Sequence, residues 1–106
     1  MKTIAIGGRI KILPETVILL EADINYTKLY LANGKQIVVA TTLKQLEKRF
    51  LVLQNFFRPH KSQIVNLNFI TTYDLANSEI TMQNHHTVFI SRRRKTKFKN
   101  HINLIF

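Results

Sequence analysis

Hydrophobic and polar residues alternate over much of the chain, in short runs separated by turn-forming residues. The clearest run covers residues 26–32, in which Leu29 and Leu31 alternate with Lys28 and Tyr30. A period of two is typical of a β-strand with one buried face. Similar runs predict strands over residues 3–6, 9–13, 16–21, 35–40, 63–65, 69–74, 78–83 and 87–91. The pattern therefore predicts a mostly β protein.

Two short polar segments predict hairpins between these strands. Asn33-Gly34 is a strong signal for a two-residue hairpin turn, because both residue types tolerate a positive φ. Asn84-His85-His86 predicts the tip of a second hairpin.

The period changes to that of a helix over residues 41–53. From Leu43 onward, apolar residues recur every three or four positions, with lysine and glutamate on the other side. Thr42 and Gln45 predict a capping box at the start of this helix. Residues 92–103 predict a second, short closing helix, with an irregular tail as the alternative.

Length and composition narrow the class of protein. We expect one domain from 106 residues, and a hydrophobic content of 45% is enough for a core. The chain has no cysteine, which excludes disulfide scaffolds and cysteine-based zinc sites and fits a reducing cytoplasm. No apolar run approaches the roughly 18 residues that span a bilayer, and the start is too short for a secretory signal.

The charge of the chain points to its partner. Lysine and arginine number 16 against 6 acids, a net charge of +10. The last acid is Glu79, so everything after it is neutral or basic. This asymmetry indicates a polyanion such as DNA, RNA or an anionic membrane surface. Solubility alone is the alternative explanation.

A candidate binding loop covers residues 57–66. Pro59 favours a bend over an uninterrupted central strand, since proline fixes φ and lacks an N–H donor. The loop displays four polar side chains, Arg58, His60, Lys61 and Ser62. The cations would bind phosphates or guanine, and the imidazole and hydroxyl would add hydrogen bonds. The alternative is a basic surface turn between core strands. Asn66 is expected to cap a turn.

A second candidate is the basic run that follows Ser91. Its three consecutive arginines are Arg92, Arg93 and Arg94. They cannot all face one way on a strand or helix, so some must point at solvent or a partner. The planar guanidinium matches phosphate and guanine. The alternative is a solvated basic tail.

A third candidate covers residues 23–28. Asn25 and Tyr26 lie where the chain enters a strand, and Lys28 follows them. Such residues can contact phosphate or a base edge. From the residues alone, an Asx turn with Tyr26 packed on the sheet is the favoured interpretation.

Enzymatic interpretations have little support. The histidines match no metal-binding motif, the acids are scattered, and no glycine-rich phosphate loop is present. We therefore expect no catalytic residues, cofactor or metal. A metal-dependent nuclease that uses His60, His85 or His101 is the weakest hypothesis.

Four segments, taken in order, resemble the LytTR-type DNA-binding domain, an output module of bacterial response regulators. They are residues 21–31, 42–47, 56–67 and 90–93, and the resemblance extends over residues 12–98. It implies an elongated all-β arrangement of small antiparallel sheets with one short helix. It also implies loops that enter successive major grooves, with contacts across the minor groove between them. Two copies would occupy adjacent direct repeats, and could form a dimer on the DNA.

Carried over by motif position, the resemblance assigns DNA contacts to Asn25 or Tyr26, to His60 and Lys61, and to Arg93. Supporting contacts would come from Arg58, Ser62, Arg92 and Arg94. The usual receiver domain is missing, which suggests a stand-alone regulator or an excised domain. Pro59 stands where the family often has isoleucine. The leading hypothesis is a cytoplasmic, sequence-specific transcriptional regulator that binds double-stranded DNA. An RNA-binding or ribosome-associated basic protein is the alternative.

Overall fold

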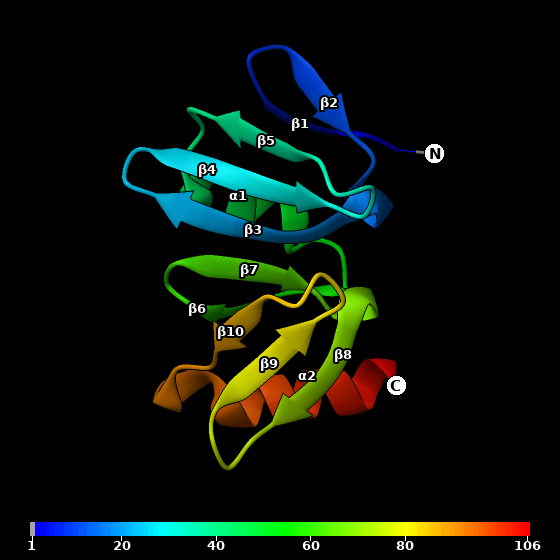
Figure 1. The fold of residues 1–106 in the computed structure, drawn as a ribbon, viewed down its shortest axis with the longest axis vertical. Helices are drawn as coiled ribbons and strands as arrows, with labels where there is room; N and C mark the ends of the chain where they lie inside the picture. Colours follow the sequence, from blue (N-terminus) through cyan, green and yellow to red (C-terminus); the bar gives the residue numbers. More distant parts are fainter. Residues whose placement is uncertain (1) are drawn as a thin grey trace.

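Short strands dominate the structure, a computed structural model that describes residues 2–106 (Figure 1). The strands are β1 (Ile4–Gly7), β2 (Ile10–Ile12), β3 (Val17–Asp23), β4 (Tyr26–Leu31), β5 (Gln36–Val39), β6 (Phe56–His60), β7 (Gln63–Asn66), β8 (Ile70–Asp74), β9 (Glu79–Met82) and β10 (Thr87–Phe89). The helices are α1 (Leu43–Phe50) and α2 (Lys95–Ile105), with 3₁₀ turns η1 (Pro14–Thr16), η2 (Leu67–Phe69) and η3 (Arg92–Arg94).

The described strands form three antiparallel sheets. The central sheet has the order β5-β4-β3-β7-β6, and the others are β1-β2 and β10-β9-β8. The molecule measures 40 × 30 × 24 Å along its principal axes, so it is elongated. The predicted fold class, small antiparallel sheets in a mainly β protein, is confirmed.

One face of the central sheet packs against α1 and the β1 strand (Figure 1). Leu20, Leu29 and Ile64 from the sheet meet Leu46 and Phe50 from α1 in this core, and all five are fully buried. The apolar positions of α1 therefore explain why it lies on the sheet. The capping box of Thr42 and Gln45 is also confirmed.

The opposite face of the central sheet packs against the β8–β10 sheet and α2, which lies at the bottom of Figure 1. Leu19 and Val65 contribute from the central sheet, and Ile80, Val88 and Phe98 come from the covering layer. A β-bulge between Val17 and Leu19 interrupts the alternation of β3, which has cores on both sides. The domain is thus three layers deep at its centre.

The hairpin at Asn33-Gly34 is present, but its turn is longer than predicted. Gly34 N–H donates to the Leu31 carbonyl at 3.0 Å, and Leu31 N–H donates to the Lys35 carbonyl at 2.9 Å. The loop therefore has three residues. Gly34 has φ 87°, whereas Asn33 has a negative φ and accepts from Lys35 N–H through its side chain. Only the glycine supplies left-handed backbone. His85, at φ 71°, lies at the tip of the second predicted hairpin.

Pro59 lies inside β6 rather than at a bend, but β6 is not an uninterrupted central strand, as the proline predicted. This strand is the edge of the central sheet, and its pairing with β7 shifts register between Phe57 and His60. An edge strand needs no N–H donor on its outer side, and a bulge further accommodates proline. The loop expected over residues 57–66 therefore shrinks to a turn at Lys61 and Ser62.

The chain ends in a helix rather than an irregular tail. The three arginines form η3, and α2 continues from it for 11 residues. The one short helix implied by the family resemblance corresponds to α1. The resemblance did not imply α2, which the pattern over residues 92–103 predicted. No helix within residues 2–106 is long and apolar enough to cross a membrane.

Asn66 serves structure, as predicted. Its buried side chain accepts from Asn68 N–H and from the Asn55 amide, each at 3.0 Å. It also donates to the Val17 carbonyl at 2.9 Å. These bonds fix the point where β7 leaves the sheet.

Candidate nucleic-acid interface

The three candidate segments lie along one edge of the molecule, on the left in Figure 1. They are the β3–β4 turn, the β6–β7 turn and η3 with the residue before it. Ala22 N–H donates to the Ser62 carbonyl at 2.8 Å, which joins the first turn to the second. Ser91 N–H donates to the Pro59 carbonyl at 2.9 Å, which joins the second turn to η3. Backbone hydrogen bonds therefore make these separate segments one continuous edge.

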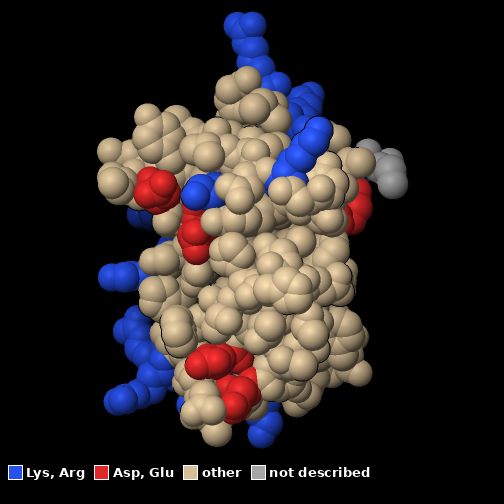
Figure 2. Space-filling model, viewed as in Figure 1, with Lys and Arg blue, Asp and Glu red and all other residues tan. Residues whose placement is uncertain are grey.

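Positive charge gathers on the lower part of this edge. Figure 2 shows lysine and arginine side chains projecting from it on the left. A hollow of about 400 Å³ lies on this part of the edge, and another of about 440 Å³ lies elsewhere on the surface. The hollow on the edge is lined by several positively charged side chains and by no acid. Its lining residues are Arg58, His60, Lys61, Ser91, Arg92, Arg93 and Arg94. Two segments that are thirty residues apart in the sequence thus build one basic hollow, which attracts anions.

The β6–β7 turn presents the side chains of His60 and Lys61. Ser62 N–H donates to His60 Nδ1 at 3.2 Å, so Nδ1 is an acceptor and the proton of the neutral ring lies on Nε2. Nε2 is therefore left as a donor. Lys61 is exposed, and Ser62 is half-buried. The imidazole and the ammonium are the groups of this turn best placed to meet a ligand.

Arg58 differs from its neighbours because its guanidinium is engaged inside the protein. Its Nη1 forms an ion pair with Glu47 Oε1 at 2.9 Å, and its Nη2 donates to the Lys61 carbonyl at 2.5 Å. The Arg58 side chain is only 17% exposed.

The β3–β4 turn displays Asn25 and Tyr26, which are both exposed. Tyr26, the first residue of β4, is 52% exposed, so the interpretation favoured from the residues alone, in which it packs on the sheet, is wrong. Lys28 belongs to the sheet rather than the turn, and its amine lies 6.0 Å from the centre of the Tyr30 ring. Asp23 is an exposed acid at the same turn. This end of the edge is therefore less basic than the hollow.

Sequence reasoning missed Ile24, the residue at the tip of the same turn. Ile24 is 93% exposed and adopts φ 55°, a left-handed conformation that β-branched residues rarely adopt. The one signal in the sequence is an apolar residue within a polar turn segment.

Replacing Ile24 by glycine is expected to stabilise the fold by about 0.5–1 kcal/mol, because glycine adopts this φ without the steric cost. The side chain is exposed, so little packing is lost. Urea unfolding of the two proteins measures the difference. Ala32→Gly, at another exposed turn residue without a positive φ, is the control and should destabilise. A destabilised Ile24→Gly protein would contradict the assignment of strain.

A polar cluster on the central sheet was also missed. The Tyr30 hydroxyl donates to Glu21 Oε1 at 3.1 Å, and the Gln63 amide donates to Glu21 Oε2 at 2.9 Å. Burial, together with the nearby carboxylates of Glu21 and Asp23, raises the pKa of Tyr30 to about 12. The Tyr30 ring lies 4.4 Å from that of His86, between ring centres. The cluster joins β3, β4 and β7 to the β9–β10 hairpin.

The histidines considered for a metal site lie apart. No group of three His, Cys, Asp or Glu side chains that could hold a metal ion occurs within residues 2–106. His60 is bonded to its own turn, and His101 contacts the Gln54 carbonyl and lies 5.4 Å from the Phe57 ring, between ring centres.

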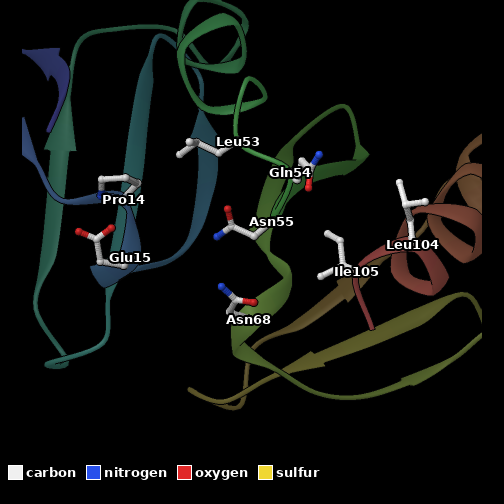
Figure 3. A pocket seen from close by; sticks show the side chains of 8 residues that line it. All are labelled: Pro14, Glu15, Leu53, Gln54, Asn55, Asn68, Leu104 and Ile105. Atoms are coloured by element: carbon white, nitrogen blue, oxygen red, sulfur yellow. The ribbon is translucent and has the colours of Figure 1, made fainter. Parts of the chain in front are cut away.

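A larger hollow, of about 530 Å³, lies between η1, the segment before β6 and the end of α2 (Figure 3). Its lining residues are Pro14, Glu15, Leu53, Gln54, Asn55, Asn68, Leu104 and Ile105. Glu15 is the one charged residue among them, so this hollow has no group of residues for acid–base chemistry or for binding an anion.

Comparison with known proteins identifies the family and a solved structure of similar fold. The family model described as the LytTr DNA-binding domain matches residues 7–103. A solved structure is similar in fold, the LytTr DNA-binding domain of a protein described as a methyl-accepting/DNA response regulator from Bacillus cereus. Its TM-score is 0.73 at 24% sequence identity, over 95% of this chain and 94% of that one. No curated protein matches.

Proposed function

Because the chain belongs to the LytTR family of DNA-binding domains, we propose that it is a transcriptional regulator that recognises a specific sequence in double-stranded DNA. The observation that carries this proposal is the continuous edge on which two distant basic segments form one hollow. A neutral or acidic edge would favour another partner. Residues 1–106 would act together as one DNA-binding domain.

The shape of the molecule supports contacts with successive major grooves. The edge runs along the longest axis, which is 40 Å long and is vertical in Figure 1. The 40 Å is the length of the whole molecule and is comparable to one helical turn of B-DNA, about 34–36 Å, so turns that follow one another along this axis would meet the duplex at more than one place on one side. The β3–β4 turn would meet one groove and η3 the next. The β6–β7 turn would lie between them.

Within this arrangement, base edges would be read by His60 and Lys61 and by Arg93, with Asn25 or Tyr26 at the far end. Arginine and lysine donate to guanine in the major groove. Arg92, Arg94 and Ser62 would bind phosphates and set the register of the domain. Lys28, which lies on the sheet, would add positive charge rather than a direct contact. Two copies would bind adjacent direct repeats.

Affinity for DNA is expected to depend steeply on salt. If the basic edge neutralises about six phosphates, log K should fall with log salt with a slope of about −5. Fluorescence anisotropy with a labelled duplex, between low and physiological salt, measures this slope. A slope near zero would contradict an electrostatic interface.

The alternative function is RNA binding. The same positive charge would also attract RNA, and such a protein would not require duplex DNA. Competition between duplex DNA and folded or single-stranded RNA for the same protein separates the two functions. Selection of bound fragments from a random DNA library tests sequence-specific binding and supplies the target site for the experiments below.

A further inference from the structure

Glu47 is an acid that reaches toward the basic hollow from a different element. It lies on α1, eleven residues before Arg58, and its side chain is 27% exposed. Its Oε1 accepts from Arg58 Nη1 at 2.9 Å. The carboxylate thus reduces the positive charge that Arg58 could otherwise offer to a phosphate.

The other end of the same guanidinium holds the β6–β7 turn. Arg58 Nη2 donates to the Lys61 carbonyl, three residues further along the chain and on the two-residue turn itself. Arg58 Nε is buried and has no hydrogen-bond partner within residues 2–106. The terminal nitrogens are therefore the points at which this side chain is bonded, one to α1 and one to the turn.

We propose that Glu47 and Arg58 are positioning residues for DNA binding, and that the pair fixes the β6–β7 turn so that Lys61 and His60 meet the DNA. The inference rests on the proposed function and deepens it, because it removes Arg58 from the phosphate contacts. A guanidinium with one terminal nitrogen bonded to a carboxylate and the other to a backbone carbonyl has lost much of its freedom before any ligand arrives.

The Glu47→Gln substitution tests the proposal, because an effect of charge alone and an effect on the position of the turn would change the affinity for DNA in opposite directions. The substitution removes one negative charge, so charge alone predicts tighter binding of DNA. The Glu47–Arg58 pair, which we call the brace of the β6–β7 turn, is lost in this variant. Its loss predicts weaker binding instead, by about fivefold or more on the selected duplex, as for residues coupled in one network. The matched control is Glu15→Gln, which removes an equal charge from the hollow of Figure 3. It should leave binding unchanged or slightly tighter.

The salt dependence separates bracing from direct contact. Arg58→Gln should weaken binding while the slope of log K against log salt stays that of the original protein. Arg92→Gln, at a residue assigned to a phosphate, should make the slope less steep by about 0.9, the loss of one phosphate contact. An equal change of slope in Arg58→Gln, or tighter binding by Glu47→Gln, would overturn the proposal.

A measurement without DNA keeps this inference distinct from the proposed function. NMR relaxation of the backbone amides of Lys61 and Ser62 should show a more mobile turn in Glu47→Gln and in Arg58→Gln, but not in Glu15→Gln. An equally rigid turn in all variants would overturn the brace even if DNA binding is confirmed. Failure of the original protein to bind any duplex would instead overturn the proposed function.

Discussion

Replacement of Phe98 by alanine is expected to lower the free energy of unfolding by about 3–5 kcal/mol, the usual cost of removing a buried phenylalanine ring. Phe98 is 0% exposed on the inner side of α2. Its ring lies 5.6 Å from the Phe57 ring and 5.4 Å from the Tyr73 ring, between centres, with edge-to-face geometry in both pairs. Alanine would lose these contacts and leave a cavity between α2 and two different sheets.

Phe106→Ala is the matched control, because the same atoms are removed from a ring that is 73% exposed. Its effect should stay within about 0.5 kcal/mol, as for most surface substitutions. Urea unfolding followed by circular dichroism gives both values. Equal losses for the two variants would show that α2 does not anchor the fold through Phe98.

The same substitution is also expected to affect the edge that we propose binds DNA. Phe98 follows the last arginine of η3 by four residues, and its partner Phe57 directly precedes Arg58. Packing of the two rings therefore helps to fix η3 beside the β6–β7 turn. Phe98→Ala should weaken binding to the selected duplex under conditions in which the variant is still folded, whereas Phe106→Ala should not.

Local patterns in the sequence were enough to predict elements whose stabilising contacts are local. The alternation in β4 and the capping box of α1 depend on neighbours within a few residues, and both are present in the structure. The β6 strand escaped prediction because its residues do not alternate and include Pro59. The strand is stabilised by its pairing with β7, and its position at the edge of the sheet tolerates the proline. Neither of these non-local features can be read from the periodicity of the sequence.

The composition of the candidate site was also only partly predictable. The basic segments were visible as charge runs, but their meeting depends on β6 lying at the edge of the sheet, where the Pro59 carbonyl is free to accept from Ser91. The position of Glu47 beside Arg58 depends on how α1 packs on the sheet. Sequence alone therefore assigned Arg58 to DNA, since its partner belongs to another element.

The second large effect expected concerns specificity, and it distinguishes reading of bases from docking on phosphates. Arg93 is exposed on η3 and lines the basic hollow, whereas Lys97 is exposed on α2 and lines a different hollow beside Phe57. Arg93→Ala should cost roughly 1–3 kcal/mol on the selected duplex and much less on a scrambled one, because an arginine that donates to guanine discriminates among bases.

Lys97→Ala is the matched control, since it also removes one positive charge within a few residues of Arg93. It should weaken binding to both duplexes alike and make the salt slope less steep by about 0.9. Anisotropy titrations of the original protein and the two variants on the two duplexes give the six affinities needed, and repeating them over a range of salt concentrations gives the slopes. Equal losses on both duplexes for Arg93→Ala would place Arg93 among the phosphate contacts, and base recognition would then have to come from the β6–β7 turn and the β3–β4 turn.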